Sequence, residues 1–218
     1  MKKIALLSFV ILFAFSFVSC TSGGTDSENS SVSSSATDNA NTGENQNTEN
    51  DEAEQPNVLV AYFSVTNNTK RVAQSISDYI GSDIYEITPS DPYTSDDIDY
   101  NDQNSRTSIE MNDPGARPEI SGSVDNMYKY DVIFLGYPIW WSEAPRIINT
   151  FLESYDFRGK TIVPFCTSGG SGIEGSVSLL ENIVSGAEWK SGMRFSSSAS
   201  EEEITDWVNG LDIDITLK

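Results

Sequence analysis

Three runs of mostly apolar residues, at 57–63, 131–136 and 160–166, restrict the fold of this chain more than any other feature of its sequence. Within these runs apolar residues follow one another instead of alternating with polar ones. A strand shows that pattern when both of its faces are buried, as in a parallel sheet covered by helices on both sides. The runs therefore predict the inner strands of such a sheet.

Helical patterns fall between and after these runs. We expect helices at 69–80, 145–155, 176–185 and 200–211, a further strand at 83–87 and a weaker one within 187–195. Five strands alternating with helices predict an α/β fold with a doubly wound parallel sheet. Pro164, inside the third apolar run, predicts a bulge or a missing ladder hydrogen bond. The segment 88–125 carries four prolines, and only a short helix between 95 and 111 is expected there.

The 218 residues include no histidine and only two cysteines, Cys20 and Cys166. The absence of histidine excludes Ser-His-Asp triads and His-ligated zinc or haem. The absence of a Cys-x-x-Cys motif excludes zinc ribbons, iron–sulfur clusters and dithiol redox motifs. Any redox chemistry must therefore come from a bound organic cofactor. Cys166 lies at the end of a predicted strand, which favours a buried structural thiol over a reactive one beside a cofactor.

The chain is acidic, with a formal net charge of −20. Residues 56–218 carry 25 acidic and 11 basic side chains, a net charge of −14. This balance disfavours nucleic acid as a partner, because binding to phosphates needs a basic surface. It suits either a partner with a basic docking surface or simple solubility.

Residues 1–19 have the organisation of a bacterial secretory signal. Two lysines precede the apolar run 4–18, which is short for a membrane-spanning helix. The stretch from Phe17 to Cys20 resembles a bacterial lipobox, which implies cleavage before Cys20 and a lipid attached to its thiol. An extracytoplasmic protein, lipid-anchored to a bacterial membrane, is the resulting expectation. An uncleaved membrane anchor is the alternative.

The segment 20–55 is expected to be a lipidated, disordered tether. It consists mainly of Ser, Thr, Asn and acidic residues, with Val32 as its one large aliphatic side chain. Such a segment cannot offset the entropy lost on ordering. A flexible coil of this length spans roughly 30–35 Å. The predicted organisation is therefore a signal at 1–19, a tether at 20–55 and a folded domain at 56–218; the alternative for the tether is a recognition segment.

Three unusual loops follow the predicted inner strands, where an open α/β sheet binds its ligands. The loop 64–69 offers hydroxyl and amide side chains beside the start of a helix, a neutral cradle for an anion or an ordinary capped turn. The loop 136–145 contains two adjacent tryptophans. One could pack inward while the other stacks on a flat ring. Alternatively, both could cover the edge of the sheet or form a patch that contacts another protein. Three glycines in 167–172 allow a ligand close to the backbone.

Taken together, these loops resemble those of the flavodoxin family. The resemblance extends over about residues 57–211 and is most specific at 62–70, 136–141 and 159–172. It implies a flavodoxin-like fold, in which a five-stranded parallel sheet of order 2-1-3-4-5 forms the middle of three αβα layers. It also implies FMN as the cofactor.

By this resemblance, three groups of residues would contact FMN. The residues that would hold the 5′-phosphate are Ser64, Thr66, Asn67, Asn68 and Thr69. Those that would flank one side of the isoalloxazine are Pro138, Ile139, Trp140 and Trp141, with Trp140 as the stacking ring. Those that would line the other side and the pyrimidine edge are Thr167, Ser168, Gly169, Gly170, Ser171 and Gly172.

The chain departs from the family pattern at two places. Asn67 stands where the phosphate loop usually has glycine, although asparagine tolerates a left-handed backbone better than most residues. The loop 167–172 has no aromatic residue, whereas electron-carrier flavodoxins commonly place a tyrosine there. One face of the flavin would then be open to a substrate or a nicotinamide.

These features favour an FMN-binding electron-transfer protein, held at a membrane and working with a redox partner protein. The alternatives are an FMN-dependent NAD(P)H or quinone oxidoreductase and a flavodoxin-fold binding module without redox turnover. An oxidoreductase oxidises NAD(P)H catalytically, whereas a carrier needs a partner enzyme. Adding negative charge to a flavin in an acidic domain costs free energy, so a low reduction potential is expected.

Overall fold

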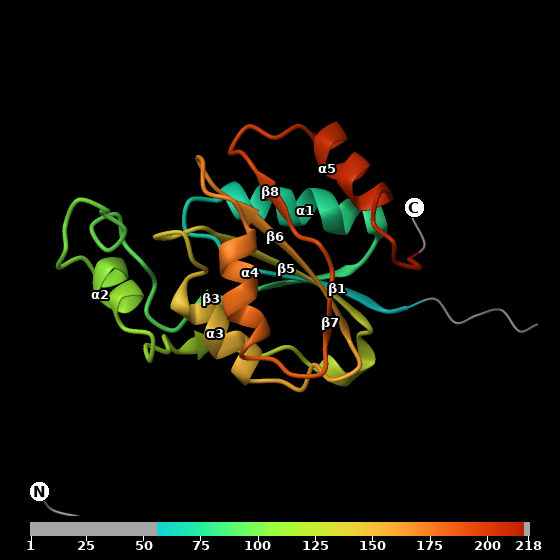
Figure 1. The fold of residues 1–218 in the computed structure, drawn as a ribbon, viewed down its shortest axis with the longest axis horizontal. Helices are drawn as coiled ribbons and strands as arrows, with labels where there is room; N and C mark the ends of the chain where they lie inside the picture. Colours follow the sequence, from blue (N-terminus) through green and yellow to red (C-terminus); the bar gives the residue numbers. More distant parts are fainter. Residues whose placement is uncertain (1–55, 216–218) are drawn as a thin grey trace, which may run out of the picture. The chain divides into compact units, whose positions relative to one another are not determined.

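A computed structural model describes residues 56–215 of the chain. Its centre is a parallel sheet in the order β2-β1-β5-β6-β7, and β8 also pairs with β6 (Figure 1). The strands are β1 (Val58–Tyr62), β2 (Asp83–Glu86), β5 (Val132–Pro138), β6 (Thr161–Thr167), β7 (Glu188–Trp189) and β8 (Met193–Phe195). The predicted order 2-1-3-4-5 is confirmed when β7 and β8 are taken together as the fifth strand.

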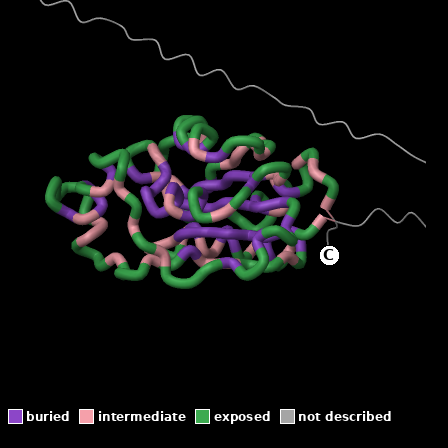
Figure 2. The backbone as a smooth tube through the Cα atoms, turned by 90° about the horizontal axis from the view of Figure 1, so that it is seen from below, coloured by how far each residue is buried: buried purple, intermediate pink, exposed green. Residues whose placement is uncertain are grey.

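Helices cover both faces of this sheet and give the three layers expected. On one face α1 (Asn68–Ile80) and α5 (Glu201–Asn209) pack on a core that includes Val60, Phe134 and Phe165. On the other face α3 (Arg146–Glu153) and α4 (Glu174–Glu181) pack on a second core. Buried residues are concentrated along the strands between the helical layers (Figure 2). Continuous apolar strands are therefore explained by burial on both faces.

Local sequence signals set where these helices begin and end. Helix α1 ends at Gly81, whose φ of 81° is easy only for glycine, and the Gly81 N–H donates to the carbonyl oxygen of Ser77 at 2.7 Å. Helix α5 begins after Ser200, whose hydroxyl accepts from the N–H of Glu203 at 3.1 Å. Ser200 is thus the N-cap of the last helix.

Helix α4 is placed differently from the prediction of 176–185. It spans Glu174–Glu181 and then tightens into a turn, in which the N–H groups of Ile183 and Val184 both donate to the carbonyl of Leu180. The amide of Asn182 also donates to the carbonyl of Ser178 at 2.8 Å. These competing bonds end the helix before the periodic apolar pattern ends.

The proline inside β6 interrupts the edge of the sheet. The N–H of Lys190 donates to the carbonyl of Ile162 at 2.9 Å, and the next ladder bond would need an N–H on Pro164. Proline has no N–H, so this ladder bond is missing. The fifth strand is consequently divided in two: β7 pairs with β6 up to Ile162, and β8 pairs with β6 from Phe165 onward. The prediction of a missing ladder bond is confirmed.

The segment 88–125 packs against one side of the domain. It contains α2 (Arg106–Asn112) and a small antiparallel pair of β3 (Thr88–Pro89) and β4 (Ile120–Ser121); a single 3-10 turn, η1 (Met127–Lys129), follows. The predicted short helix is confirmed at the end of the expected range 95–111, and it ends one residue beyond that range. Figure 1 shows α2 projecting beside the sheet.

The predicted signal and tether lie outside the described residues. Within 56–215 no helix is long and apolar enough to cross a membrane.

We predict that Gly136→Ala destabilises the domain. Gly136 lies in β5, and a Cβ at this position would collide with the ring of Phe165, which is fully buried. Overpacking of this kind costs about 1–3 kcal/mol. Urea denaturation followed by far-UV circular dichroism measures the change, and Gly170→Ala, where a Cβ meets open space, is the matched control. Equal midpoints for the two variants would contradict this packing.

Candidate functional site

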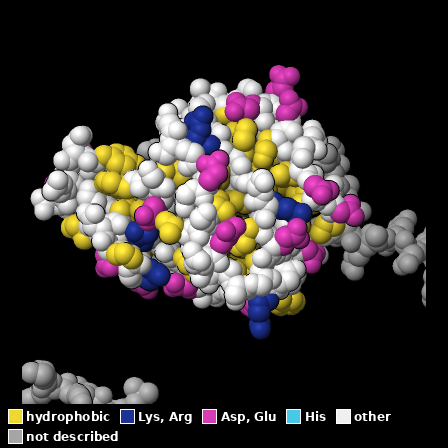
Figure 3. Space-filling view, viewed as in Figure 1, with side chains coloured by type: hydrophobic (Ala, Val, Ile, Leu, Met, Phe, Trp, Pro, Cys, Tyr) yellow, Lys and Arg dark blue, Asp and Glu magenta, His cyan; other side chains and the backbone are white. Residues whose placement is uncertain are grey.

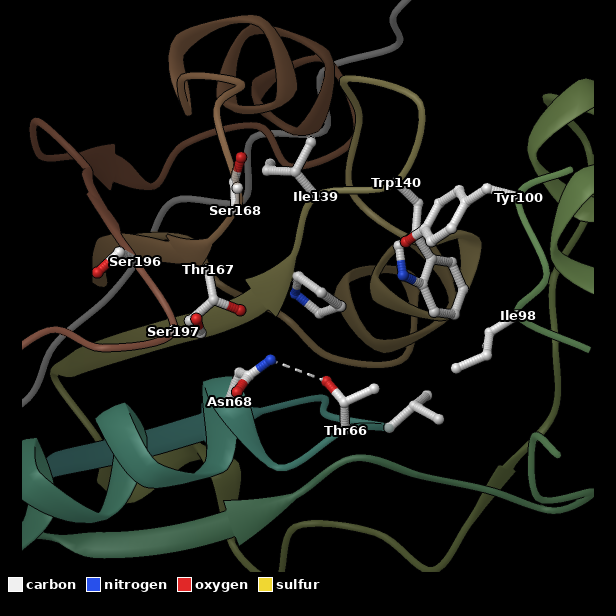
Figure 4. Close-up of a pocket in the computed structure, with 13 residues that line it drawn as sticks. Thr66, Asn68, Ile98, Tyr100, Ile139, Trp140, Thr167, Ser168, Ser196 and Ser197 are labelled. Carbon is white, nitrogen blue, oxygen red and sulfur yellow. Dashed lines mark hydrogen bonds between the residues drawn. The ribbon is translucent and has the colours of Figure 1, made fainter. Parts of the chain in front are cut away.

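A cavity of about 490 Å³ lies at the carboxyl ends of β1, β5, β6 and β8 (Figure 4). This is the edge at which open α/β sheets bind ligands, and the volume is typical of a small-molecule site. Its lining comes from five separate parts of the chain and consists of Val65, Thr66, Asn68, Ile98, Tyr100, Pro138, Ile139, Trp140, Thr167, Ser168, Gly169, Ser196 and Ser197. None of these side chains carries a charge.

The floor of the cavity is the loop that leads into α1. Asn67 adopts a left-handed backbone, with φ 62° and ψ 0°, so asparagine makes here the conformation that glycine would make more easily. Within the described residues, the backbone N–H groups of 65–70 have no protein acceptor. They lie at the positive end of a 13-residue helix. This loop can therefore hold an anion through N–H groups.

A buried hydrogen bond joins this first loop to the end of β6. The hydroxyls of Thr69 and Thr167 lie 2.8 Å apart, and both side chains are buried. The lysine nearest the loop does not supply a free charge, because Lys70 Nζ donates to Glu86 Oε2 at 2.8 Å. Glu86 also accepts from the hydroxyl of Tyr62 at 2.9 Å, and burial together with this carboxylate raises the pKa of Tyr62. Lys70 therefore offers no free positive charge to an anion bound at this loop.

The tryptophan loop is a tight, strained turn. Trp140 and Glu143 exchange two backbone hydrogen bonds of 2.9 Å, and the residues between them have positive φ, 47° at Trp141 and 67° at Ser142. Such turns normally use Asn-Gly, and positive φ in other residues costs about 1 kcal/mol or more each. The buried guanidinium of Arg146 holds the turn, donating to Glu143 Oε2 and to the carbonyl of Met111, both at 2.8 Å.

The turn sends its two tryptophans in different directions. Trp140 is 4% exposed and packs edge-on against Phe63 and Tyr93, with ring centroids 5.5 Å from each. It forms one wall of the cavity. Trp141 is 42% exposed, is not part of the lining, and lies beside Tyr100.

The third loop forms the opposite wall. The N–H of Ile139 donates to the carbonyl of Thr167 at 3.0 Å, and the N–H of Ser168 donates to the carbonyl of Phe195 at 3.1 Å. Arg194 Nη1 donates to the carbonyl of Ser168 at 3.1 Å. These bonds fix the start of the loop against the neighbouring strands, so the cavity has a defined wall on this side.

The structure brings about half of the predicted site residues together. Those that line the cavity are Thr66, Asn68, Pro138, Ile139, Trp140, Thr167, Ser168 and Gly169. Those that do not line it are Ser64, Asn67, Thr69, Trp141, Gly170, Ser171 and Gly172. Of the second group, Asn67 shapes the first loop and Thr69 ties it to β6.

Two parts of the cavity lining were not predicted from the sequence: the serines after β8 and two residues of the segment 88–125. Ser196 and Ser197 follow β8, and the serine-rich stretch after the fifth strand was the available signal. Arg71 fixes this stretch, donating to the carbonyls of Ala199 at 2.8 Å and Ser197 at 3.2 Å. Ile98 and Tyr100 come from the irregular segment 88–125, where only the length of the segment suggested a functional role.

Cys166 is the second-last residue of β6, next to this site, and does not line the cavity. It is fully buried, and burial raises the pKa of its thiol to about 12. The structure therefore favours a buried structural thiol over a reactive thiol beside a cofactor. Among residues 56–215 no group of His, Cys, Asp and Glu side chains is arranged to hold a metal ion.

An uncharged cavity with an N–H-rich floor and an aromatic wall, at this edge of a sheet of this order, defines a flavodoxin-like protein. Residues 57–211 match the sequence profile of a family described as Flavodoxin. The chain belongs to the flavodoxin family. This membership confirms the predicted fold and supports FMN as the predicted cofactor.

Solved structures agree with this assignment. A Bacteroides eggerthii protein, provisionally described as a flavoprotein, is 46% identical with a TM-score of 0.68, over 72% of this chain and 99% of that one. A similar protein of Bacteroides uniformis is 42% identical, with the same TM-score and coverage. A Lactobacillus acidophilus flavoprotein in complex with FMN shares the fold, at 22% identity and a TM-score of 0.53 over 70% of this chain and 99% of that one. Among curated proteins, none matches.

We predict that Cys166 resists alkylation in the folded protein. With its pKa raised to about 12, the thiolate fraction at pH 8 is on the order of 10⁻⁴, and the sulfur is shielded from solvent. In a Cys20→Ser variant, iodoacetamide should label the chain slowly when folded and rapidly in urea, as measured by mass spectrometry. Rapid labelling of the folded chain would show that this end of β6 opens.

Proposed function

We propose that the chain is an FMN-binding electron-transfer protein, tethered outside the cytoplasm by a lipid on Cys20. One observation carries the FMN assignment: the cavity combines unpaired N–H groups at 65–70 with the wall of Trp140. An anionic phosphate fits the first feature and a flat apolar ring fits the second. Val65, Thr66 and Asn68 from the first feature and Trp140 from the second line the same cavity.

Each part of the site has a role in this proposal. The N–H groups of 65–70 and the side chains of Thr66 and Asn68 hold the phosphate, and the amide of Asn68 already donates to the hydroxyl of Thr66 at 3.1 Å. Ile139 and Trp140 exclude water from the ring. Residues 167–169 line the side on which its polar edge would lie. Bound FMN supplies the electron-transfer chemistry, and no side chain is required as an acid or a base.

The electrostatics of the domain favour a low reduction potential. The cavity lining has no charged side chain, and the domain as a whole has a net charge of −14. Neither can neutralise an electron added to the site, so reduction is disfavoured and the loaded protein is a donor. In Figure 3 acidic side chains are spread over the face shown. This distribution suits a redox partner with a basic docking surface.

The second candidate function is an FMN-dependent NAD(P)H or quinone oxidoreductase. The third loop supports it, because Thr167–Gly172 contributes no aromatic side chain to cover the ring. The residues that line the cavity argue against NAD(P)H as the substrate of such an enzyme. None of them is basic, whereas a nicotinamide dinucleotide carries several phosphates. The third candidate, a binding module without redox turnover, was suggested by Asn67 in place of the usual glycine. Asn67 has the left-handed backbone that glycine would adopt, so this departure no longer favours that candidate.

The membrane tether rests on the sequence. The lipobox-like stretch ending at Cys20 and the polar segment up to residue 55 would hold the domain at a surface with a flexible spacer. Because nicotinamide nucleotides are scarce outside the cytoplasm, that location favours a carrier over an NAD(P)H oxidoreductase.

We predict that Asn68→Asp weakens FMN binding while leaving riboflavin binding intact. A carboxylate at this position would repel the phosphate, whereas riboflavin lacks one. The dissociation constant for FMN should rise at least about tenfold, and that for riboflavin should change less than about twofold. Fluorescence titration of the flavin measures both constants.

The substitution is nearly isosteric, and an acidic residue in the first turn of a helix is favourable, so folding should be unaffected. Asn182→Asp, at the far end of α4, is the matched control and should change neither constant. Equal losses for FMN and riboflavin in Asn68→Asp would contradict the placement of the phosphate.

A further inference from the structure

Another cavity, of about 320 Å³, is lined by residues of α3 and α4, by residues 114 and 117, and by the end of the tryptophan turn. It shares no described lining residue with the cavity at the carboxyl ends of the strands. Its volume is at the lower end of the range for small-molecule sites. This cavity is therefore a separate candidate site, on the face of the sheet that α3 and α4 cover.

A buried amide in the wall of this cavity has no partner. Asn149 of α3 is 8% exposed, and among residues 56–215 its side-chain amide forms no hydrogen bond. The residue lines the cavity, so its amide is available to an occupant. Buried amides normally pair with a protein group, a water molecule or a ligand, because an unpaired one costs free energy. Asn149 therefore offers an oxygen acceptor and an N–H donor to an occupant.

Arg146 adds donors beside this amide. It lies one turn before Asn149 on the same face of α3 and is 7% exposed. Its Nε, Nη1 and Nη2 donate to the carbonyl of Glu110, the carboxylate of Glu143 and the carbonyl of Met111. A guanidinium has five N–H groups, so two of them have no acceptor among the described residues. An oxygen of an occupant can therefore accept from both Arg146 and Asn149.

The charges around this cavity are already balanced. Arg146 pairs with Glu143 at 2.8 Å, and Arg117 pairs with Glu153 at 2.7 Å. Among the described lining residues, neither an anion nor a cation would find an unpaired opposite charge. Moving a charge out of water without such a partner costs free energy, so the lining favours a neutral occupant.

Helix α4 and the residues after it supply an apolar part of the lining. Ser176 adds no free polar group there, because its hydroxyl donates to the carbonyl of Ile173 at 2.7 Å and lies 3.0 Å from the hydroxyl of Tyr137. Leu179 is 48% exposed, and an occupant with an apolar body would remove this surface from water, which a water molecule cannot do. The apolar residues on this side are Leu179, Leu180 and Ile183.

We propose that this cavity is a second binding site, which takes a small neutral molecule with a carboxamide group on an apolar body. The carbonyl oxygen of a carboxamide can accept from Asn149 and Arg146, and its N–H can donate to the oxygen of Asn149. The apolar body would lie against Leu179. The inference does not rest on the proposed function, because the two cavities have no described lining residue in common.

The probe is benzamide, which joins a carboxamide to an apolar ring and carries no charge. Added to the ¹⁵N-labelled full chain, it should shift the side-chain amide signal of Asn149, with a dissociation constant on the order of millimolar. That signal is assigned by its loss in Asn149→Leu. Benzoate, with a charge in place of the amide, should bind at least about fivefold more weakly. Equimolar FMN should leave the shifts caused by benzamide unchanged.

Two variants test the named contacts through the backbone signals. Asn149→Leu removes the amide at nearly constant volume, and Leu179→Glu places a charge on the apolar side at an exposed position. Each should weaken benzamide binding at least about fivefold. Thr150→Val, on the same helix, is the matched control and should change nothing, because Thr150 does not line the cavity and its buried hydroxyl has no partner among the described residues. Urea midpoints verify that the variants remain folded.

The outcomes decide the inference separately from the proposed function. No binding of benzamide to the unchanged chain, or equal binding to Asn149→Leu, would overturn it. Tighter binding of benzoate would overturn the neutral class of ligand. Displacement of benzamide by equimolar FMN would place the probe in the first cavity and would also overturn the second site. None of these results decides whether the chain binds FMN, which the direct titration with FMN measures.

Discussion

The parallel pairing of β1, β5 and β6 is the constraint on which the rest of the structure depends. Its register places Tyr62 beside Gly136, and Pro138 beside Thr167, so the loops that follow the three strands leave from one edge. The pairing is kept by burial of both faces of the sheet. The hydrogen bond between Thr69 and Thr167 then locks the first loop to the end of β6. The site is thus a consequence of strand order and not of any single motif.

The same edge shows how an acidic protein without histidine can offer a site for an anion. The cavity offers dipoles in place of charges: helix-start N–H groups at one end and backbone groups of 167–169 at another. The basic residues near it serve the structure. Lys70 pairs with Glu86, Arg71 holds the serine loop, and Arg146 holds the strained turn. A phosphate can bind there while the charge that reduction adds stays uncompensated, which links the binding mode to the expected low potential.

Most of the fold was predictable because its signals are local. The apolar runs and the interrupting Pro164 each act on neighbouring residues, and both predictions were confirmed. The site was predictable only where a loop follows an inner strand. The direction of each tryptophan side chain depends on a turn with two positive φ angles. Neither Trp nor Ser is a residue type that indicates positive φ, so the sequence does not predict this turn. The contribution of Tyr100 depends on the packing of α2 against Tyr93 and Trp140, a set of long-range contacts with no periodic pattern in the sequence.

The central claim is that this cavity binds FMN, and the absorbance spectrum of the chain tests it most directly. The purified chain would be mixed with excess FMN, passed through a desalting column and measured across the visible range. The account predicts a retained flavin band stoichiometric with protein, and no retained band after the same treatment in urea. A colourless folded protein would contradict the account, because an intact fold would then lack a working cradle between residues 65–70 and Trp140.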